Sequence, residues 1–212
     1  QNFDGLVLSF PKNNKIAGEG IANEGINSTK LGLKGIPALA EHIQIARDIF
    51  LLEYTGGKLH IPTISSAKSV ELIKDAKKKG LKVTCSVAAH HLVLTDNELH
   101  GFDSNFKTNP PLRTKDDIKV LQKGVKSGVI DIITSDHNPI DIEHKKVEFS
   151  EAKDGIIGLE TAFGAVNSVL DLEDFINCIT TKPKEIFGIE NYSIKVGNIA
   201  DVTLFDPNSY VT

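Results

Sequence analysis

The sequence lacks the features that mark membrane proteins, secreted proteins and nucleic-acid-binding proteins. No apolar run approaches the roughly 20 residues that cross a bilayer, and Gln1-Asn2-Phe3-Asp4 does not resemble a signal peptide. Acidic residues (28) slightly outnumber Lys and Arg (24), and no basic stripe is present. We therefore expect neither a membrane nor a nucleic acid as a partner.

Some residue types are also scarce or missing. The chain has no methionine and no tryptophan, and the absence of methionine indicates a processed, truncated or incomplete chain. The two cysteines, Cys85 and Cys178, lie in apolar stretches without Cys-x-x-Cys or Cys/His spacing. This predicts buried, reduced thiols and a cytoplasmic location. The remaining composition, 40% hydrophobic and 25% charged, is typical of a globular protein.

Apolar, strand-like segments alternate with helical segments along most of the chain. The strand-like segments contain few polar residues, as is typical of a parallel sheet covered on both faces. This alternation predicts an α/β fold whose functional residues lie in loops after the strands. We expect four parallel strands, adjacent in this order, at residues 6–10, 58–65, 81–89 and 129–135.

The helical segments carry start signals, stop signals and apolar faces. The first begins at Pro37 and ends at Gly56-Gly57. We expect Thr114 to cap a later helix and Gly188 to end one long helix that begins at residue 172. The periodicity predicts Ile43, Ala46, Phe50 and Tyr54 as the buried face of the first helix, and Val70, Ile73 and Ala76 as that of the second.

The stretch "ITSDHNPI" (residues 133–140) raises the question of function. A strand that delivers Asp136 and His137 to its carboxyl end is typical of the active-site rim of a (β/α) barrel. Four strands are too few for a closed barrel, which needs eight strands and about 250 residues. The pattern alone leaves open a part of a barrel or a smaller doubly wound sheet.

Several motifs, in order along the chain, resemble the dihydroorotase family of metal-dependent amidohydrolases. They are "ANEGINSTKLGLKGIP", "AEHIQIARDI", "LKVTCSVAAHHLVLTDNEL", "NPPLR", "GVIDIITSDHNP", "DGIIGLETAFG" and "IKVGNIADVTLFDPN". The resemblance implies the carboxyl-terminal half of a TIM-type (β/α)8 barrel, about its fifth to eighth strands, over residues 1–190. Residues 191–212 would then return into a small composite β-domain.

The family reaction is the reversible hydrolysis of dihydroorotate to N-carbamoyl-aspartate in pyrimidine biosynthesis. Zinc makes this possible at neutral pH because it lowers the pKa of bound water. The resemblance assigns to Asp136 the positions of metal ligand and proton shuttle. It assigns Asn109 to binding of the pyrimidine.

Three positions depart from the family pattern. Phe10 stands where the fifth strand of family members ends in a histidine ligand, and Thr63 replaces the histidine ligand of the sixth strand. Ile140 replaces the histidine that holds the substrate carboxylate. A phenyl ring has no lone pair and a threonine hydroxyl is a poor zinc ligand. We therefore expect no zinc in this chain, and we expect Phe10 to pack as an apolar plug beside Asp136 and Thr63.

Each candidate residue also has a structural interpretation. Asp136 equally fits a residue that caps the turn after its strand. His60 fits a packed strand histidine better than a ligand, since Thr63 offers no second imidazole. His90 and His91 would point to opposite faces if they lie on a strand, which excludes a shared metal ion.

Three functions remain open. We favour a non-catalytic homologue that acts as a structural partner. For this homologue the resemblance implies association with aspartate carbamoyltransferase, and we expect a homo-oligomer. The alternatives are an active zinc dihydroorotase and a hydrolase of another cyclic amide.

Overall fold

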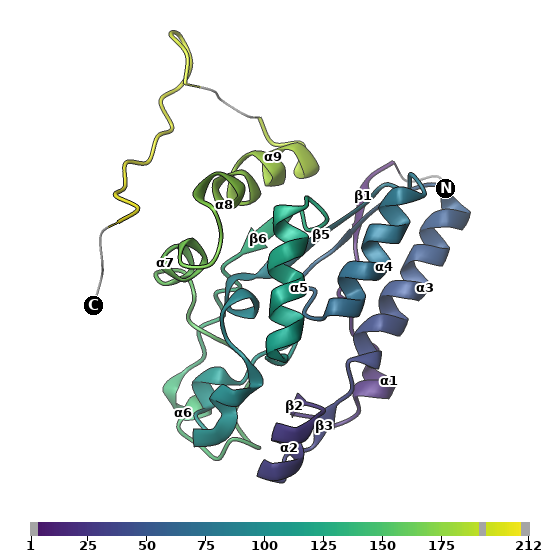
Figure 1. Cartoon of the computed structure of the whole chain (residues 1–212), viewed down its shortest axis with the longest axis vertical. Helices are drawn as coiled ribbons and strands as arrows, with labels where there is room; N and C mark the ends of the chain where they lie inside the picture. The colour runs from purple at the N-terminus through teal and green to yellow at the C-terminus, as the bar shows by residue number, and fades with distance from the viewer. Residues whose placement is uncertain (1–3, 191–193, 209–212) are drawn as a thin grey trace.

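The computed structural model describes residues 4–190 and 194–208, and its centre is a parallel sheet (Figure 1). The sheet contains β1 (Leu6–Leu8), β4 (Lys58–Ile61), β5 (Val83–Ala88) and β6 (Ile132–Thr134), hydrogen-bonded in that order. All neighbouring strands are parallel. The predicted order and direction are therefore confirmed. The strands are shorter than predicted because the chain leaves the sheet before the apolar residues end.

Helices flank the sheet and connect its strands. Helix α3 (Leu39–Thr55) precedes β4, α4 (Ala67–Lys78) precedes β5, and α5 (Lys115–Lys126) precedes β6. These helices lie side by side, α3 against α4 and α4 against α5 (Figure 1). The other elements are α1 (Asn14–Ala17), β2 (Ala22–Asn23), α2 (Ile26–Leu31), β3 (Gly35–Ile36), α6 (Ile142–Lys145), α7 (Ala162–Asn167), α8 (Leu172–Ile179), α9 (Thr181–Phe187) and the 3-10 turns η1 (Ala89–Leu92), η2 (Asp96–Gly101) and η3 (Ser104–Phe106).

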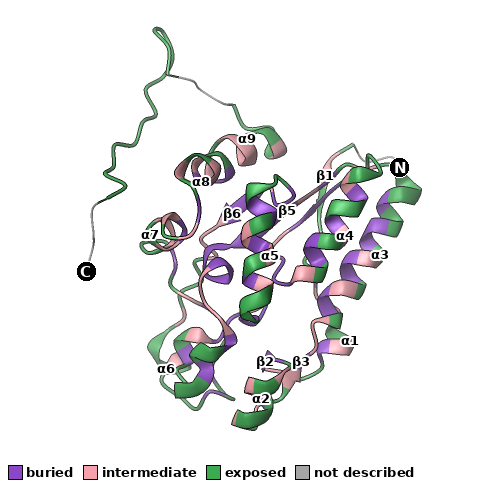
Figure 2. Ribbon diagram, in the orientation of Figure 1, coloured by how far each residue is buried: buried purple, intermediate pink, exposed green. Residues whose placement is uncertain are grey.

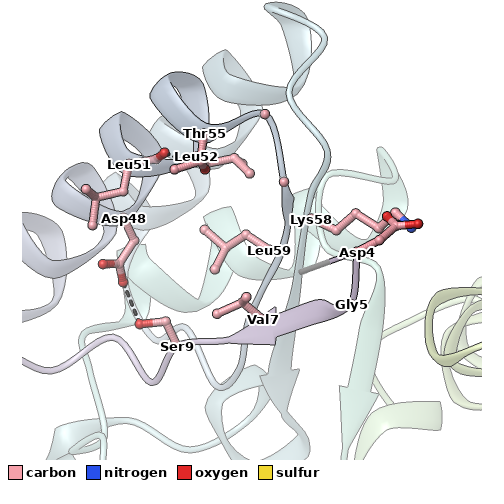
Figure 3. A pocket seen from close by; sticks show the side chains of 12 residues that line it. Asp4, Gly5, Val7, Ser9, Asp48, Leu51, Leu52, Thr55, Lys58 and Leu59 are labelled. Atoms are coloured by element: carbon pink, nitrogen blue, oxygen red, sulfur yellow. Dashed lines mark hydrogen bonds and ion pairs between the residues drawn. The ribbon is translucent and has the colours of Figure 1, made fainter. Parts of the chain in front are cut away.

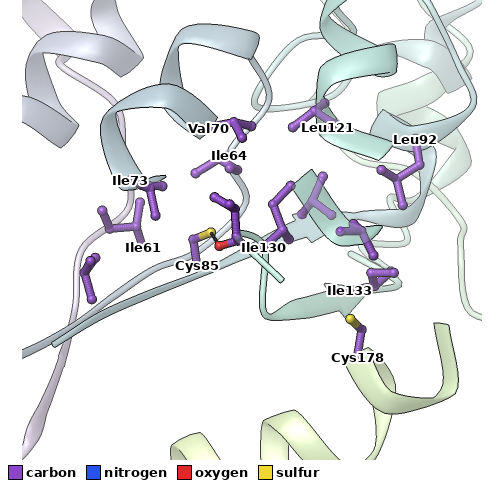
Figure 4. Packing of buried hydrophobic residues seen from close by; sticks show 14 of the residues in the cluster. Ile61, Ile64, Val70, Ile73, Cys85, Leu92, Leu121, Ile130, Ile133 and Cys178 are labelled. Atoms are coloured by element: carbon purple, nitrogen blue, oxygen red, sulfur yellow. Dashed lines mark hydrogen bonds between the residues drawn. The ribbon is translucent and has the colours of Figure 1, made fainter. Parts of the chain in front are cut away.

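The hydrophobic core lies between the sheet and α4 and α5 (Figure 4). Ile61 of β4, Ile73 of α4 and Leu121 of α5 are fully buried there. Burial of one such side chain contributes roughly 1.5–3 kcal/mol. Cys85 and Cys178 are buried and free, as predicted. Burial raises the pKa of the Cys85 thiol to about 12, so this thiol stays protonated.

The buried face of α3 differs from the prediction. Phe50 and Tyr54 are 70% and 82% exposed, whereas Ile45, Ile49 and Leu52 are buried (Figure 2). The spacing of these three residues matches a single helix face as well as the predicted set does. The buried face also contains Glu41, Gln44 and Asp48, and these polar residues hid it from an analysis of apolar periodicity.

The other helix predictions are confirmed in part. Val70, Ile73 and Ala76 of α4 are buried. Thr114 caps α5, and its hydroxyl accepts a hydrogen bond from the backbone N–H of Asp117. The predicted long helix after residue 172 is wrong, because the non-helical backbone of Thr180 (φ −125°, ψ −74°) divides it into α8 and α9. Gly188 ends α9 in the left-handed conformation.

Residues 194–208 form neither helix nor strand, and Phe205 contacts the ring of Phe163 from α7. Residues 191–193 and 209–212 lie outside the described part, so the predicted return into a second β-domain at 191–212 stays a prediction. Within the described ranges, no helix has the length and apolar character of a membrane span.

Candidate functional site

A cavity of about 230 Å³ opens where the strands end. Phe10 after β1, Asn109 after η3 and Asp136 after β6 line it together with Asp154. Three of the residues predicted for the site therefore share one cavity. Its remaining lining residues are Thr108, Asn138, Gly155 and Ile156.

Asp136 occupies a strained and partly buried position. Its φ of 48° lies in the left-handed region, which is uncommon for residues other than glycine. The side chain is 35% exposed, and burial raises the pKa of its carboxyl group. His90 Nε2 lies 4.0 Å from Asp136 Oδ2, which is beyond hydrogen-bonding distance. Asp136 lines the cavity, and its assignment as a metal ligand and proton shuttle stays a prediction.

Thr63, after β4, is held in a similar backbone conformation. Its φ is 53°, a genuine outlier for a β-branched residue. Its backbone N–H donates to Ser86 Oγ at 3.1 Å, which fixes this conformation. Thr63 is buried and is not among the residues that line the cavity. We expected Thr63, Phe10 and Asp136 to lie together. Phe10 and Asp136 do line the same cavity, but Thr63 does not.

The prediction that Phe10 is a packed apolar plug is wrong. Its side chain lines the cavity but is 42% exposed. Strand β1 ends at Leu8, and the backbone N–H of Lys12 donates to the carbonyl of Phe10 at 2.9 Å. This tight turn leaves the ring at the open edge of the sheet, where no further strand packs on it in the described part of the chain.

Asn109 is connected to a residue that the sequence analysis missed. Lys12 Nζ donates to Asn109 Oδ1 at 3.2 Å. The Asn109–Pro110 peptide bond is cis. Burial raises the pKa of Asp154, while the nearby Lys107 and Lys12 lower it. Lys12 lies in the loop after β1, and its place after a strand was the signal available in the sequence.

The amidohydrolase family model matches residues 18–212. The chain belongs to the amidohydrolase family. Its relatives include dihydroorotases from Trichlorobacter lovleyi, 44% identical over 207 residues, and from a Thermoanaerobacter species, 44% identical over 211 residues. These alignments cover 95% and 97% of this chain but 49% of each relative. The chain thus spans about half the length of the curated relatives it matches, and its resemblance to dihydroorotases is confirmed.

Solved amidohydrolase structures have the same fold. The L-hydantoinase (dihydropyrimidinase) of Arthrobacter aurescens matches with a TM-score of 0.79 at 24% identity, over 93% of this chain and 47% of that one. The dihydropyrimidinase of Brevibacillus agri matches with a TM-score of 0.78 at 24% identity, over 93% and 47%. This confirms an α/β fold that corresponds to about half of a TIM-type amidohydrolase barrel.

A buried polar network lies behind the site of this amidohydrolase chain. Arg113 Nη2 lies 3.4 Å from Glu41 Oε2, and both side chains are almost fully buried. Ser65 and Ser69 donate hydroxyl hydrogen bonds to Glu41, and Arg113 Nε donates to Ser65 Oγ at 2.9 Å. Arg113 Nη1 also donates to Asn23 Oδ1 at 2.7 Å. The network ties the "NPPLR" loop that carries Asn109 to α3 and to the start of α4.

A second set of contacts holds the segment after β6. His137 Nδ1 accepts hydrogen bonds from the backbone N–H groups of Gly158 and Leu159, so Nδ1 is unprotonated. The buried Lys107 donates to the carbonyls of Phe149, Ser150 and Ala152. These contacts fix the segment that brings Asp154 and Ile156 to the cavity.

Gly155 and Ile140 pack tightly within this segment. Gly155 has a φ of 156°, and a Cβ there would lie 2.5 Å from the carbonyl oxygen of Asn138 and 2.7 Å from Ile140 Cγ1. Ile140 therefore contacts the loop rather than the cavity, and its side chain is not among the cavity residues. The assignment of Ile140 to a lost carboxylate-binding position stays a prediction.

Three other histidines, His60, His90 and His91, are buried in the scaffold. His60 Nδ1 forms a hydrogen bond with Thr84 Oγ1 at 2.8 Å, and its ring contacts Phe187 edge-on, as expected of a packed histidine. His90 and His91 lie in η1 rather than on a strand, so their expected orientation on opposite faces is wrong. Their ring centroids are 4.3 Å apart because a 3-10 turn places neighbouring side chains much closer than a strand does.

The family implies a zinc site, for which nitrogen, oxygen and sulfur ligands are needed. Among residues 4–190 and 194–208, no three His, Cys, Asp or Glu side chains lie together in a way that could hold a metal ion. Asp136 is the one carboxylate here at a family ligand position. The residues of this chain alone do not fit a zinc site, since such sites use about four N, O or S ligands.

Proposed function

We propose that the chain is the carboxyl-terminal half of a dihydroorotase-family barrel that is non-catalytic and acts as a structural partner in pyrimidine synthesis. The observation that carries the proposal is the donor set at the strand ends. Asp136 remains at the cavity, but Phe10 and Thr63 offer no imidazole at the positions where the family pattern has ligands. Without these ligands the chain lacks the means to create the zinc-bound hydroxide of the family reaction.

The backbone conformation at the end of β4 supports the proposal that the fold is retained while the metal-binding side chains are lost. Thr63 stays in a left-handed conformation that costs a β-branched residue about 1–3 kcal/mol. Such strain is common where a site needs a side chain in one direction. Thr63 thus keeps the strained backbone conformation although its side chain is a poor metal ligand.

The open edge of the sheet supports a role that depends on association. Val7 and Leu8 of β1 are 50% and 57% exposed. A hollow of about 510 Å³ lies between β1 and α3, with Leu51 and Leu59 on its walls (Figure 3). Unpaired strand edges next to apolar side chains are prone to association. We propose that the amino-terminal half of a longer gene product covers this edge and closes the barrel.

As the partner of the closed barrel we propose aspartate carbamoyltransferase, with the chain itself as a homo-oligomer. The test is copurification of the full-length gene product with the carbamoyltransferase from its own host, followed by assays of both enzymes. We expect the carbamoyltransferase to elute with the barrel protein and to lose stability when the barrel protein is removed. Separate elution of the two proteins at native concentrations would refute the partnership.

The runner-up function is an active zinc dihydroorotase, because Asp136 and Asn109 share one cavity. Turnover of N-carbamoyl-aspartate and of dihydroorotate by the full-length protein separates the two functions. The proposal predicts no turnover in either direction. A hydrolase of another cyclic amide would be recognised by turnover of a hydantoin or a dihydropyrimidine instead.

A further inference from the structure

A groove of about 660 Å³ runs between the outer surfaces of α4 and α5, away from the strand ends and from the open edge at β1. Val70, Val120 and Val129 contribute apolar surface to it, together with Gly124. Gly124 permits the two helices to approach, since a Cβ there would lie 3.0 Å from Ile130 and 3.2 Å from Val70. At the floor of the groove Val70 and Val129 are 5% and 8% exposed, and Val120 is partly exposed.

The rim of this α4–α5 groove is basic, in contrast to the whole chain, which has a formal charge of −4. Lys68 and Lys74 lie on the α4 side and Lys123 on the α5 side, and all three are exposed. Glu71 is the one acidic residue among the lining residues, and it pairs with Lys68 at 2.8 Å. In the described part of the chain, neither Lys74 nor Lys123 has a carboxylate partner.

We propose that the α4–α5 groove binds an acidic amphipathic helix of another protein. The apolar floor would receive the apolar stripe of that helix, and Lys74 and Lys123 would pair with carboxylates on its two flanks. An extended peptide fits less well, because both walls are helices whose backbone groups are already hydrogen-bonded and offer no strand edge.

A small anion is also disfavoured as the occupant. The backbone N–H of Ala67, at the start of α4, would be the natural donor to such an anion. It already donates to Asp117 Oδ1 at 2.8 Å. An anion would leave the partly exposed Val120 uncovered, whereas an amphipathic helix covers it and meets the lysines together. The inference does not depend on whether the barrel is catalytic.

The test uses designed, fluorescently labelled helical peptides and the full-length protein, with binding measured by fluorescence anisotropy. One peptide has a leucine stripe flanked by glutamates, a second has lysines in place of the glutamates, and a third has serines in place of the leucines. We expect the first to bind at least about tenfold more tightly than either of the others, and to bind more weakly as salt is raised. Equal binding of the glutamate and lysine peptides, or no binding of the glutamate peptide, would overturn the proposal.

Charge-reversal variants test whether the glutamate peptide binds in the α4–α5 groove. Lys74→Glu/Lys123→Glu should weaken binding of the glutamate peptide by about tenfold, since repulsion replaces attraction at both flanks. The matched control Lys30→Glu/Lys82→Glu makes the same charge change at exposed positions outside the groove and should leave binding unchanged. Equal effects of the two double variants would overturn the location. A self-association that Lys74→Glu/Lys123→Glu abolishes would assign the groove to a second copy and refute the proposed partner.

Discussion

The strand-end cavity and the polar network behind it differ in how completely their polar groups are paired. In the network, the carboxylate of Glu41 receives hydrogen bonds from Ser65 and Ser69 and lies beside Arg113. At the cavity, Asp136 Oδ2 lies 4.0 Å from His90 Nε2, beyond hydrogen-bonding distance. Both ring nitrogens of the buried His90 lack a hydrogen-bond partner in the described part of the chain. The contrast shows that hydrogen bonds pair the polar groups of the network more completely than those at the cavity.

The largest effect should come from breaking the network. Arg113→Met leaves the buried Glu41 carboxylate without its cation and should lower the free energy of unfolding by about 3–5 kcal/mol. Urea denaturation of both proteins measures this difference. As a control, Lys126→Met removes an exposed partner of Asp171 and should leave the unfolding curve unchanged. Similar curves for Arg113→Met and the unmodified protein would contradict a scaffold held by this network.

A core substitution compares the packed side of the sheet with its open edge. Ile73→Ala in α4 should cost about 2–4 kcal/mol, because it leaves a cavity in the core. Leu8→Ala at the exposed edge should cost clearly less, since little of the Leu8 side chain is buried. Thermal and urea unfolding of the two variants provide the comparison. A larger loss for Leu8→Ala would show that a partner already covers β1.

Acid should weaken the scaffold through His91, whose ring lies 3.3 Å from the carbonyl of Pro111 in the "NPPLR" loop. Burial lowers the pKa of His91 from 6.5 to about 4. The neutral ring is favoured in the folded state, so this stability is complete above pH 6.5 and is lost as the pH falls toward 4. We expect a loss of about 2 kcal/mol between roughly pH 7.5 and pH 5.

The measurement for His91 is urea denaturation at several pH values in parallel with His91→Gln. The free energy of unfolding of His91→Gln should fall less steeply with decreasing pH than that of the unmodified protein. The carboxylates and other histidines contribute the same pH dependence to both proteins. An unchanged slope in His91→Gln would show that another group causes the loss.

The smallest effect concerns the strained strand end. Thr63→Gly should raise the free energy of unfolding by about 0.5 kcal/mol, because glycine adopts a positive φ without strain but loses more chain entropy on folding. Thr134→Gly, within β6, should instead lower it by about 1 kcal/mol. A loss at Thr63 as large as that at Thr134 would mean that the side chain of Thr63 stabilises the fold.

The sequence predicted the sheet well because the strands are apolar runs and the helices α3, α4 and α5 between them have readable end signals. Strand order followed from the parallel alternation, and the caps at Thr114 and Gly188 were readable from single residues. The buried face of α3 could not be predicted in this way. Glu41 is buried because it pairs with Arg113, which lies far from it in the sequence. Such long-range pairing leaves no periodic signal.

The candidate site was predictable where residues follow strands or belong to a recognised motif. Asp136 and Phe10 follow strands, Asn109 belongs to the "NPPLR" motif, and all three line the cavity. Asp154 was missed, because the segment held by Lys107 and His137 folds back by side-chain contacts rather than by regular structure. Lys12 was missed because its contact with Asn109 joins residues 97 positions apart in the sequence. The exposure of Phe10 depends on what covers the edge of β1, and that information is not local to the residue.

The most direct test of the central claim is the zinc content of the full-length protein, measured together with turnover of N-carbamoyl-aspartate. The account predicts no stoichiometric zinc and no turnover for the unmodified protein. It also predicts that Phe10→His/Thr63→His raises the zinc content if the amino-terminal half supplies its own ligands. A stoichiometric pair of zinc ions in the unmodified protein, with a turnover that Asp136→Ala abolishes, would contradict the account and identify an active enzyme.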